Sequence, residues 1–407
     1  MAWTCKAGRE DDLRAVATAK FDALQTEWQS YDVFWRLGHS FDTVIDYFAI
    51  VDKSEALTFA PTALAAFGRS LSNACWYDDY GWWGIAALKA SQHPDMFKAD
   101  DTKYVPGFAA ICNLCWDTMH YRGTAVWDNN QNDPTRAPLR PRFDGGVWNC
   151  DWTGESMCGA TNAPPELPTN PPDRDQGANL SGIQNTVTNG LYLVLASRLA
   201  EVTGGGVYME GAKSEFGFLS QWFAAVPSDV ALLQIPNGGI GKLVRERVAT
   251  YAGGTKAYVN GYVPELSWSG DQGIILGGLI DRMMIVSADK NPQSPPFLDA
   301  CAILNGVANV TNSNSAGVLQ PWTSGDGGDP GDYATGMGVF MRYLLYADQR
   351  NVLGMRKITR GADYQKLIDA NVQAVLNNKV PHDDADLLTD LTNCLAILVA
   401  AIVMCNN

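Results

Sequence analysis

Hydrophobic residues recur three and four positions apart along most of the chain, which is the spacing that places them on one face of an α-helix. The pattern is clear in LRAVATAKFDALQTEW at 13–28 and in VTNGLYLVLASRLAEV at 187–202. No stretch shows the sustained alternation of apolar and polar residues that indicates a β-strand. The spacing predicts about a dozen helices, in segments 13–28, 41–51, 61–74, 82–90, 108–121, 187–202, 214–226, 242–252, 271–288, 296–310, 333–350, 362–376 and 386–403.

A series of helices joined by short connections can close into a ring of helical hairpins around one shared core. We therefore expect an all-α protein, an (α/α)6 toroid that forms a single domain over residues 1–407. Residues 123–182 are the main irregularity, because Pro, Asn, Asp and Gly dominate there. Helical patterns continue on both sides, so we predict a long loop on the rim of the active face and no domain boundary.

The composition narrows the possible partners. Hydrophobic residues make up 46% of the chain and charged residues 18%, as in a compact globular protein. The formal net charge is −14, and no cluster of Lys and Arg interrupts it. Such a chain repels nucleic acids and anionic membrane surfaces, whereas a neutral polysaccharide meets no electrostatic obstacle. The 13 tryptophans fit this class of ligand, since indole faces stack on flat apolar groups, although we expect most of them in the core.

The cysteines and the apolar segments give weaker indications. Cys112 and Cys115 form a CNLC motif without a second CxxC or a histidine at ligand spacing, so we expect buried thiols and no metal site. Cys150 and Cys158 flank a polar loop and could form a disulfide in an exported protein. The first residues do not have the pattern of a signal peptide. The apolar run at 395–404 is too short for a membrane span and predicts a buried final helix.

The strongest candidate for chemistry is the stretch WYDDYGWWGIAALKA at 76–90. Crowding two carboxylates among aromatic rings costs free energy, so Asp78 and Asp79 need a reason to be adjacent. If a helix begins here, Trp82 and Trp83 follow them by one turn, and the two carboxylates diverge by about 100°. A retaining glycosidase uses two carboxyl groups about 5 to 5.5 Å apart, one as nucleophile and one as acid/base.

Two other interpretations compete for the same residues. Asp78 could cap the helix while Asp79 interacts favourably with the helix dipole, and the tryptophans would then only fill the core. Terpene cyclases and prenyltransferases are also helical toroids with aspartates near aromatic residues. Their DDxxD or DxDD motif is absent, because the sequence here reads WYDDYGW.

The stretch WYDDYGWWGIAALKA resembles the aspartate-pair signature of glycoside hydrolase family 76, the endo-α-1,6-mannanases. Four further segments are similar to that family in the same order: FWRLGHSFDTVIDYF, FDGGVWN with IQNTVTNGLYLVLASRLAEVTG, ELSWSGDQGIILGGLIDRM, and MGVFMRYL. Together they run from about residue 34 to residue 344. The sequence departs from the family at Asn149, where a second aromatic residue is usual, and at Asp271, where the family has Asn.

The resemblance implies an (α/α)6 fold, retention of configuration, and chemistry without a metal or cofactor. It also implies that Asp78 is the nucleophile and Asp79 the general acid/base. The residues that we expect to contact substrate are Trp82, Trp83, Trp148, Asn185, Asn189, Trp268, Asp271 and Gln272. Asparagine and glutamine can bind sugar hydroxyls, but they also cap helices, so both roles stay open for them. We interpret His39 as structural.

The sequence therefore predicts an endo-acting retaining hydrolase that cleaves α-1,6-mannosidic linkages in mannan. We expect it to be monomeric and to act outside the cell or at the cell surface. A mannan transglycosidase of cell-wall remodelling and a non-catalytic mannan-binding protein are the alternatives. The products formed from linear α-1,6-mannooligosaccharides separate the three: shorter chains, transferred chains, or no change.

Overall fold

The structure, a computed structural model, describes residues 10–74, 76–97, 101–124, 145–149, 185–224, 232–234, 241–246, 267–313, 317–321, 331–354, 361–380 and 386–405. Twelve α-helices lie within these ranges, together with short 3-10 turns, a π-helical turn and two short strands. The prediction of an all-α protein is confirmed.

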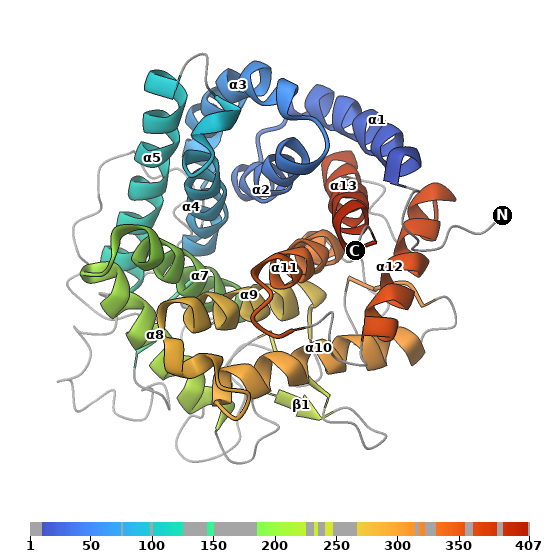
Figure 1. The fold of residues 1–407 in the computed structure, drawn as a ribbon. Helices are drawn as coiled ribbons and strands as arrows, with labels where there is room; N and C mark the ends of the chain where they lie inside the picture. The colour runs from blue at the N-terminus through green and yellow to red at the C-terminus, as the bar shows by residue number, and fades with distance from the viewer. Residues whose placement is uncertain are drawn as a thin grey trace, which may run out of the picture.

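The helices form two concentric rings (Figure 1). The inner ring consists of α2 (Phe34–Ile50), α4 (Tyr77–Ser91), α7 (Thr186–Thr203), α9 (Ser269–Ile285), α11 (Gly336–Arg350) and α13 (Leu387–Met404). It is closed, because each helix packs against the next and α13 packs against α2. The outer ring consists of α1 (Glu10–Trp28), α3 (Ala56–Ser70), α5 (Asp101–Asp117), α8 (Val207–Phe223), α10 (Pro295–Ser313) and α12 (Gly361–Leu376). Outer and inner helices alternate along the chain, which is the predicted (α/α)6 arrangement.

The two rings differ in how their helices are buried. The outer helix α1 buries a single stripe, formed by Leu13, Ala17, Phe21, Leu24 and Trp28. This is the amphipathic pattern of a helix with one face on a core. The inner helices α7 and α13 are buried on nearly every side, since outer helices cover one face and neighbouring inner helices cover the others.

Glycine permits the close packing of α9 against α11. A Cβ atom at Gly273 would lie 2.8 Å from the Cα of Phe340, closer than real Cβ contacts come. One at Gly277 would lie 2.3 Å from the ring of Tyr343. Side chains at these two positions would therefore push the helices apart.

A short hairpin of β1 (Leu232–Gln234) and β2 (Lys242–Val244) corrects one prediction. The sequence predicts a helix at 242–252, but its first three residues pair antiparallel with β1, and the part beyond residue 246 lies outside the described residues. The strand β2 passes so close to α10 that a Cβ atom at Gly306 would lie 2.0 Å from the carbonyl oxygen of Lys242. This contact with α10 favours a strand over the helix that the local spacing predicts.

Charged side chains fill the ring toward the C-terminal ends of the inner helices. The Nζ of Lys89 lies 2.8 Å from Oδ1 of Asp42 and 2.7 Å from Oδ1 of Asp46. The Nε of Arg342 lies 2.8 Å from the other oxygen of Asp42. Burial alone would raise the pKa of Asp42, but Arg342 and Lys89 outweigh it and lower that pKa well below its usual range. The pairs join α2, α4 and α11 through the core.

The apolar C-terminal helix belongs to the inner ring. Among the described residues, α13 is the one helix that is both long enough and apolar enough to cross a membrane. However, 78% of its 18 residues are buried inside the protein. The prediction of a buried final helix is confirmed. Cys112 and Cys115 are also buried, unpaired thiols, as predicted.

The loop that we predict at 123–182 falls within the described residues only at 123–124 and 145–149. Its place on the rim, and the assignment of the whole chain to a single domain, stay predictions.

Candidate active site

The starts of the inner helices meet at one end of the ring. In three of them, the first backbone N–H donates to the carbonyl of a loop segment that comes from elsewhere in the chain. These bonds are Tyr77 to Asn149 at 2.8 Å, Thr186 to Glu246 at 2.7 Å, and Ser269 to Pro321 at 3.0 Å. The first turns of α4, α7 and α9 are therefore fixed by the loop segments around them.

Side chains connect the remaining helix starts at the same end. Arg36, in the first turn of α2, lies 3.0 Å from Asp332, which precedes α11, and also pairs with Asp386 at the start of α13. The indole N–H of Trp268 donates to the carbonyl of Tyr333 at 2.8 Å, which links α9 to the same segment.

Asp78 and Asp79 occupy the first turn of α4, as the sequence predicts. The Asp79 side chain turns back to accept a hydrogen bond from the backbone N–H of Trp76 at 3.1 Å, and the residue is only 4% exposed. Asp78 is partly exposed and lies one turn before Trp82. Trp82 packs against His39 of α2, with ring centroids 5.4 Å apart, so Asp78 is on the side of α4 that faces this helix.

The surroundings of Asp78 disfavour its charged form. Burial raises its pKa well above the usual range, and the negative charges of Asp79 and Asp332 raise it further. Its Oδ1 atom is covered and has no hydrogen-bond partner. Hydrogen bonds from the backbone N–H groups of Asp78 and Asp79 offset part of this rise. Asp79 is more deeply buried, and its carboxylate instead accepts from the N–H of Trp76, the residue before the helix. Two adjacent carboxyl groups thus lie in contrasting environments, which is the arrangement that acid/base chemistry with paired carboxylates requires.

His39 lies beneath this pair in a closed packing environment. It is 1% exposed, and Arg342 donates a hydrogen bond to its Nδ1 at 3.1 Å. Burial first, and the charge of Arg342 second, lower the pKa of His39 well below its usual value. The contacts thus favour the structural interpretation of this histidine.

Asn189 and Gln272 use their amides on the protein backbone. Asn189 accepts a hydrogen bond from the N–H of Val147 at 2.7 Å, and donates to the carbonyl of Val147 at 2.9 Å and of Asn185 at 2.7 Å. Gln272 holds Val244 in the same way: it accepts from the N–H of Val244 at 2.7 Å and donates to the carbonyl of Val244 at 2.8 Å. These residues are 0% and 1% exposed. Both amide hydrogens of each residue have backbone acceptors, which favours a clamping role, and the sugar contacts stay a prediction.

Two other predicted substrate contacts also have structural roles. The side chain of Asn185 caps α7 by accepting from the N–H of Thr188 at 3.1 Å. Asp271 is 0% exposed in the first turn of α9, where a negative charge interacts favourably with the helix dipole. The predicted substrate contact of Asp271 stays a prediction.

The predicted stacking tryptophans are buried. Their exposed fractions are 3% for Trp82, 0% for Trp83, 2% for Trp148 and 4% for Trp268. Trp83 also donates its indole N–H to the carbonyl of Phe34 at 2.7 Å. The structure therefore places all four in the packed core or against the loops.

Partly exposed aromatic residues at this end were not predicted as ligand contacts. They are Trp35 in the first turn of α2, Trp76 immediately before α4, and Tyr333 before α11. The ring centroids of Trp35 and Trp82 are 6.2 Å apart, and the guanidinium of Arg36 lies 5.3 Å from the centroid of Trp35. Their position before or within the first turn of an inner helix is the signal in the sequence that could have identified them.

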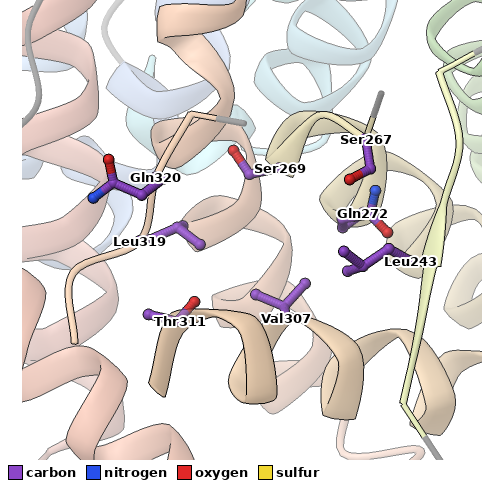
Figure 2. A pocket seen from close by; sticks show the side chains of 8 residues that line it. All are labelled: Leu243, Ser267, Ser269, Gln272, Val307, Thr311, Leu319 and Gln320. Carbon is purple, nitrogen blue, oxygen red and sulfur yellow. The ribbon is translucent and has the colours of Figure 1, made fainter. Parts of the chain in front are cut away.

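A small cavity lies beside the side chain of Gln272 (Figure 2). Its lining residues are Leu243, Ser267, Ser269, Gln272, Val307, Thr311, Leu319 and Gln320. The volume of about 30 Å³ accommodates about one water molecule, far less than a sugar ring. This cavity is too small to be the substrate cleft. Within the described ranges, no group of three His, Cys, Asp or Glu residues could hold a metal ion.

No family model matches the sequence, and no curated protein does. Solved structures are similar to it along almost the whole chain. The α-1,6-mannanase GH76A from Salegentibacter sp. HEL1_6 has a TM-score of 0.61 and 15% identity, covering 96% of this chain and 99% of that chain. An inactive variant of that mannanase, with two consecutive aspartates substituted, was solved with α-1,6-mannotriose. Its TM-score is 0.57, at 13% identity and the same coverage.

Dfg5 from Chaetomium thermophilum, solved in complex with glucosamine, is also similar. Its TM-score is 0.58 and its identity 14%, over 98% of this chain and 92% of that chain. At these identities the similarity establishes the fold. The toroid implied by the resemblance to glycoside hydrolase family 76 is thus confirmed.

Proposed function

We propose that this chain is a family 76 glycoside hydrolase that cleaves α-1,6-mannosidic linkages in mannan, with Asp78 and Asp79 as its catalytic pair. One observation carries the proposal: two adjacent carboxyl groups lie in the first turn of an inner helix, in a fold shared with an α-1,6-mannanase over 96% of this chain. Substitution of two consecutive aspartates accompanies inactivity in the variant of that mannanase. The contrasting environments of Asp78 and Asp79 support the same assignment.

The proposed reaction is a double displacement. One carboxylate attacks the anomeric carbon while the other carboxyl group protonates the departing glycosidic oxygen, which gives a covalent mannosyl-enzyme. The second group then takes a proton from water, and that water attacks the anomeric carbon and releases the bound mannan chain with retained configuration. The pair must therefore share a single proton at the start, as two close carboxyl groups do when one pKa is raised.

The two roles can be assigned in either order. The resemblance implies that Asp78 is the nucleophile and Asp79 the acid/base. The surroundings in the unliganded protein favour the reverse, because the pKa of Asp78 is raised, whereas Asp79 accepts a backbone N–H. These alternatives predict different products when one carboxyl group is removed.

The deciding experiment uses Asp78→Ala and Asp79→Ala with an activated aryl α-mannoside and added azide. Without the acid/base, the activated substrate still forms the covalent intermediate, and azide releases an α-mannosyl azide. Without the nucleophile, azide attacks the substrate directly and gives the β-azide. Loss of the acid/base should lower the turnover of natural mannan by about 10²- to 10⁴-fold.

A control for that experiment is Asp95→Asn, which removes an exposed carboxylate paired with Lys53 and should leave turnover unchanged. Wild-type activity in both alanine variants, or a β-anomer as the first product of the wild-type enzyme, would refute the proposed pair and its retaining mechanism.

Transglycosylation by the same carboxyl pair is the second candidate. Incubation with linear α-1,6-mannotetraose should give shorter chains if hydrolysis dominates. Longer or transferred chains would support the transglycosidase, and unchanged chains would support a mannan-binding protein. The cut positions in longer oligosaccharides test whether attack is internal.

We further propose that the protein acts outside the cell or at its surface, as a monomer and a single domain. The disulfide bond of Cys405 supports an oxidising compartment. Fractionation of the native host tests the location. Light scattering coupled to size exclusion tests the monomer, and limited proteolysis tests the single domain.

A further inference from the structure

Among the described residues, no carboxylate forms an ion pair with the buried cation Arg245. It follows β2 directly and is 5% exposed. Its Nε and Nη1 atoms are covered and have no hydrogen-bond partner. Arg342, which is 3% exposed, also has covered nitrogens without a hydrogen-bond partner, but it differs in having an ion pair with Asp42 and a hydrogen bond to Thr43 at 3.1 Å.

The backbone around Arg245 is held in place on both sides. Thr186 donates through its hydroxyl to the carbonyl of Arg245 and through its backbone N–H to Glu246. Gln272 clamps Val244 through both halves of its amide. These bonds fix the backbone from which the side chain of Arg245 extends.

The carboxylate that follows Arg245 contacts another group. Glu246 follows Arg245 in sequence, but its Oε1 accepts a hydrogen bond from the hydroxyl of Tyr333. A buried ion that lacks a partner is costly, so proteins usually supply a counter-charge or a ligand. The Nε and Nη1 donors of Arg245 lack acceptors, and a ligand would provide them.

We propose that Arg245 binds an oxyanion: a phosphate, sulfate or carboxylate group. The planar guanidinium suits such groups, because it can donate two parallel hydrogen bonds to two of their oxygens. The start of α7 lies beside Arg245 and adds a favourable dipole.

The location connects this anion site to the catalytic pair. Glu246 contacts Tyr333, and the next residue toward the N-terminus, Asp332, acts electrostatically on Asp78. The anion is thus a charged substituent on the glycan that occupies the cleft, a part of the proposal that rests on the proposed function. Free inorganic phosphate has the same chemistry and is the other source to test.

The first test compares the thermal stability of Arg245→Met and Arg342→Met in phosphate-free buffer. Removing an unpaired buried cation should raise the Tm, whereas removing Arg342 takes away one of the two cations that pair with the buried Asp42 and should lower it. A Tm that falls in Arg245→Met as it does in Arg342→Met would show that Arg245 already has a structural partner, and would overturn the proposal.

The second test titrates inorganic phosphate into the full-length protein. The wild type should gain stability with phosphate, and Arg245→Met should bind it about 10- to 100-fold more weakly, as expected for the loss of charge-assisted hydrogen bonds. Arg245→Lys should recover part of the affinity. An equal response in the wild type and Arg245→Met would refute the site.

The third test separates the sources with the Asp78→Ala, Asp79→Ala double variant, which cannot turn over its ligand. Phosphorylated α-1,6-mannotriose should bind more tightly than both neutral mannotriose and phosphate, and Arg245→Met should abolish that gain. Binding of phosphate without any gain for the phosphorylated glycan would refute the glycan-borne anion. Hydrolysis of neutral mannan tests the proposed function separately, since it does not require Arg245.

Discussion

Asn189→Asp tests whether the buried amide of Asn189 holds a loop or a sugar. Aspartate has nearly the same shape and keeps the oxygen that accepts from the N–H of Val147. It replaces the amide nitrogen that donates to the carbonyls of Val147 and Asn185 at 2.9 and 2.7 Å. In the variant an oxygen would face these two carbonyl oxygens.

The structure sets the expected size of the effect. Each buried carbonyl that loses its donor costs about 1 to 3 kcal/mol, so the two together cost roughly 2 to 6 kcal/mol of unfolding free energy. The same loop segment also binds α4, since the carbonyl of Asn149 accepts from the N–H of Tyr77. Loosening Val147 should therefore disturb the first turn that carries Asp78 and lower kcat more than it raises KM.

Urea unfolding measures the stability of Asn189→Asp, and steady-state kinetics on α-1,6-mannotetraose measures its activity. Gln221→Glu is a matched control, because its amide donates to Gly217 on the exposed face of α8. This control should change the stability by less than about 0.5 kcal/mol. Wild-type stability of Asn189→Asp together with a raised KM would refute the clamp and restore the sugar contact.

Two further variants test the energetics of the site and of the fold. The pKa of Asp78 is raised in the folded protein, so the unfolded chain releases this proton at a lower pH. The protein therefore loses stability as the pH rises from the unfolded pKa of about 3.9 toward the folded pKa. Asp78→Asn should therefore raise the Tm at neutral pH, with a gain that shrinks toward about pH 4; a gain independent of pH would refute this. Gly306→Ala should cost about 1 to 3 kcal/mol, because its Cβ would lie 2.0 Å from the oxygen of Lys242. A Cβ atom added at Gly217 in α8 would meet open space, so Gly217→Ala should instead gain about 0.5 to 1 kcal/mol of unfolding free energy, measured with urea. Equal effects of the two substitutions would contradict the packing described.

The helices could be predicted from the sequence because their signal is local. The stripe on α1 and the apolar runs of α7 and α13 are periodic over several turns, and each run corresponds to one helix. The strand β2 could not be predicted in this way. Its helical spacing is also local, but the pairing with β1 and the contact with α10 come from other parts of the chain.

The candidate site was predictable only in part. The aspartate pair stood out because two adjacent anions among aromatic residues are costly wherever they lie. For Asn189 and Gln272 the residue type was ambiguous, since an amide binds a sugar hydroxyl and a peptide group equally well. Their partners are 42 and 28 residues away, so the sequence alone did not indicate which role applies.

A regular arrangement explains how these amides support the site. Each of three loop segments is held at one residue by the first N–H of an inner helix, and two residues earlier by an amide side chain from another helix. In the first segment these are Asn149 and Val147, with the amide of Asn189. In the second they are Glu246 and Val244, with Gln272. In the third they are Pro321 and Leu319, with Asn371. An amide can hold a peptide group because it both donates and accepts, whereas a carboxylate only accepts. The start of α4 is held through its backbone N–H, so the side chains of Asp78 and Asp79 are not needed to attach this loop segment and can serve chemistry.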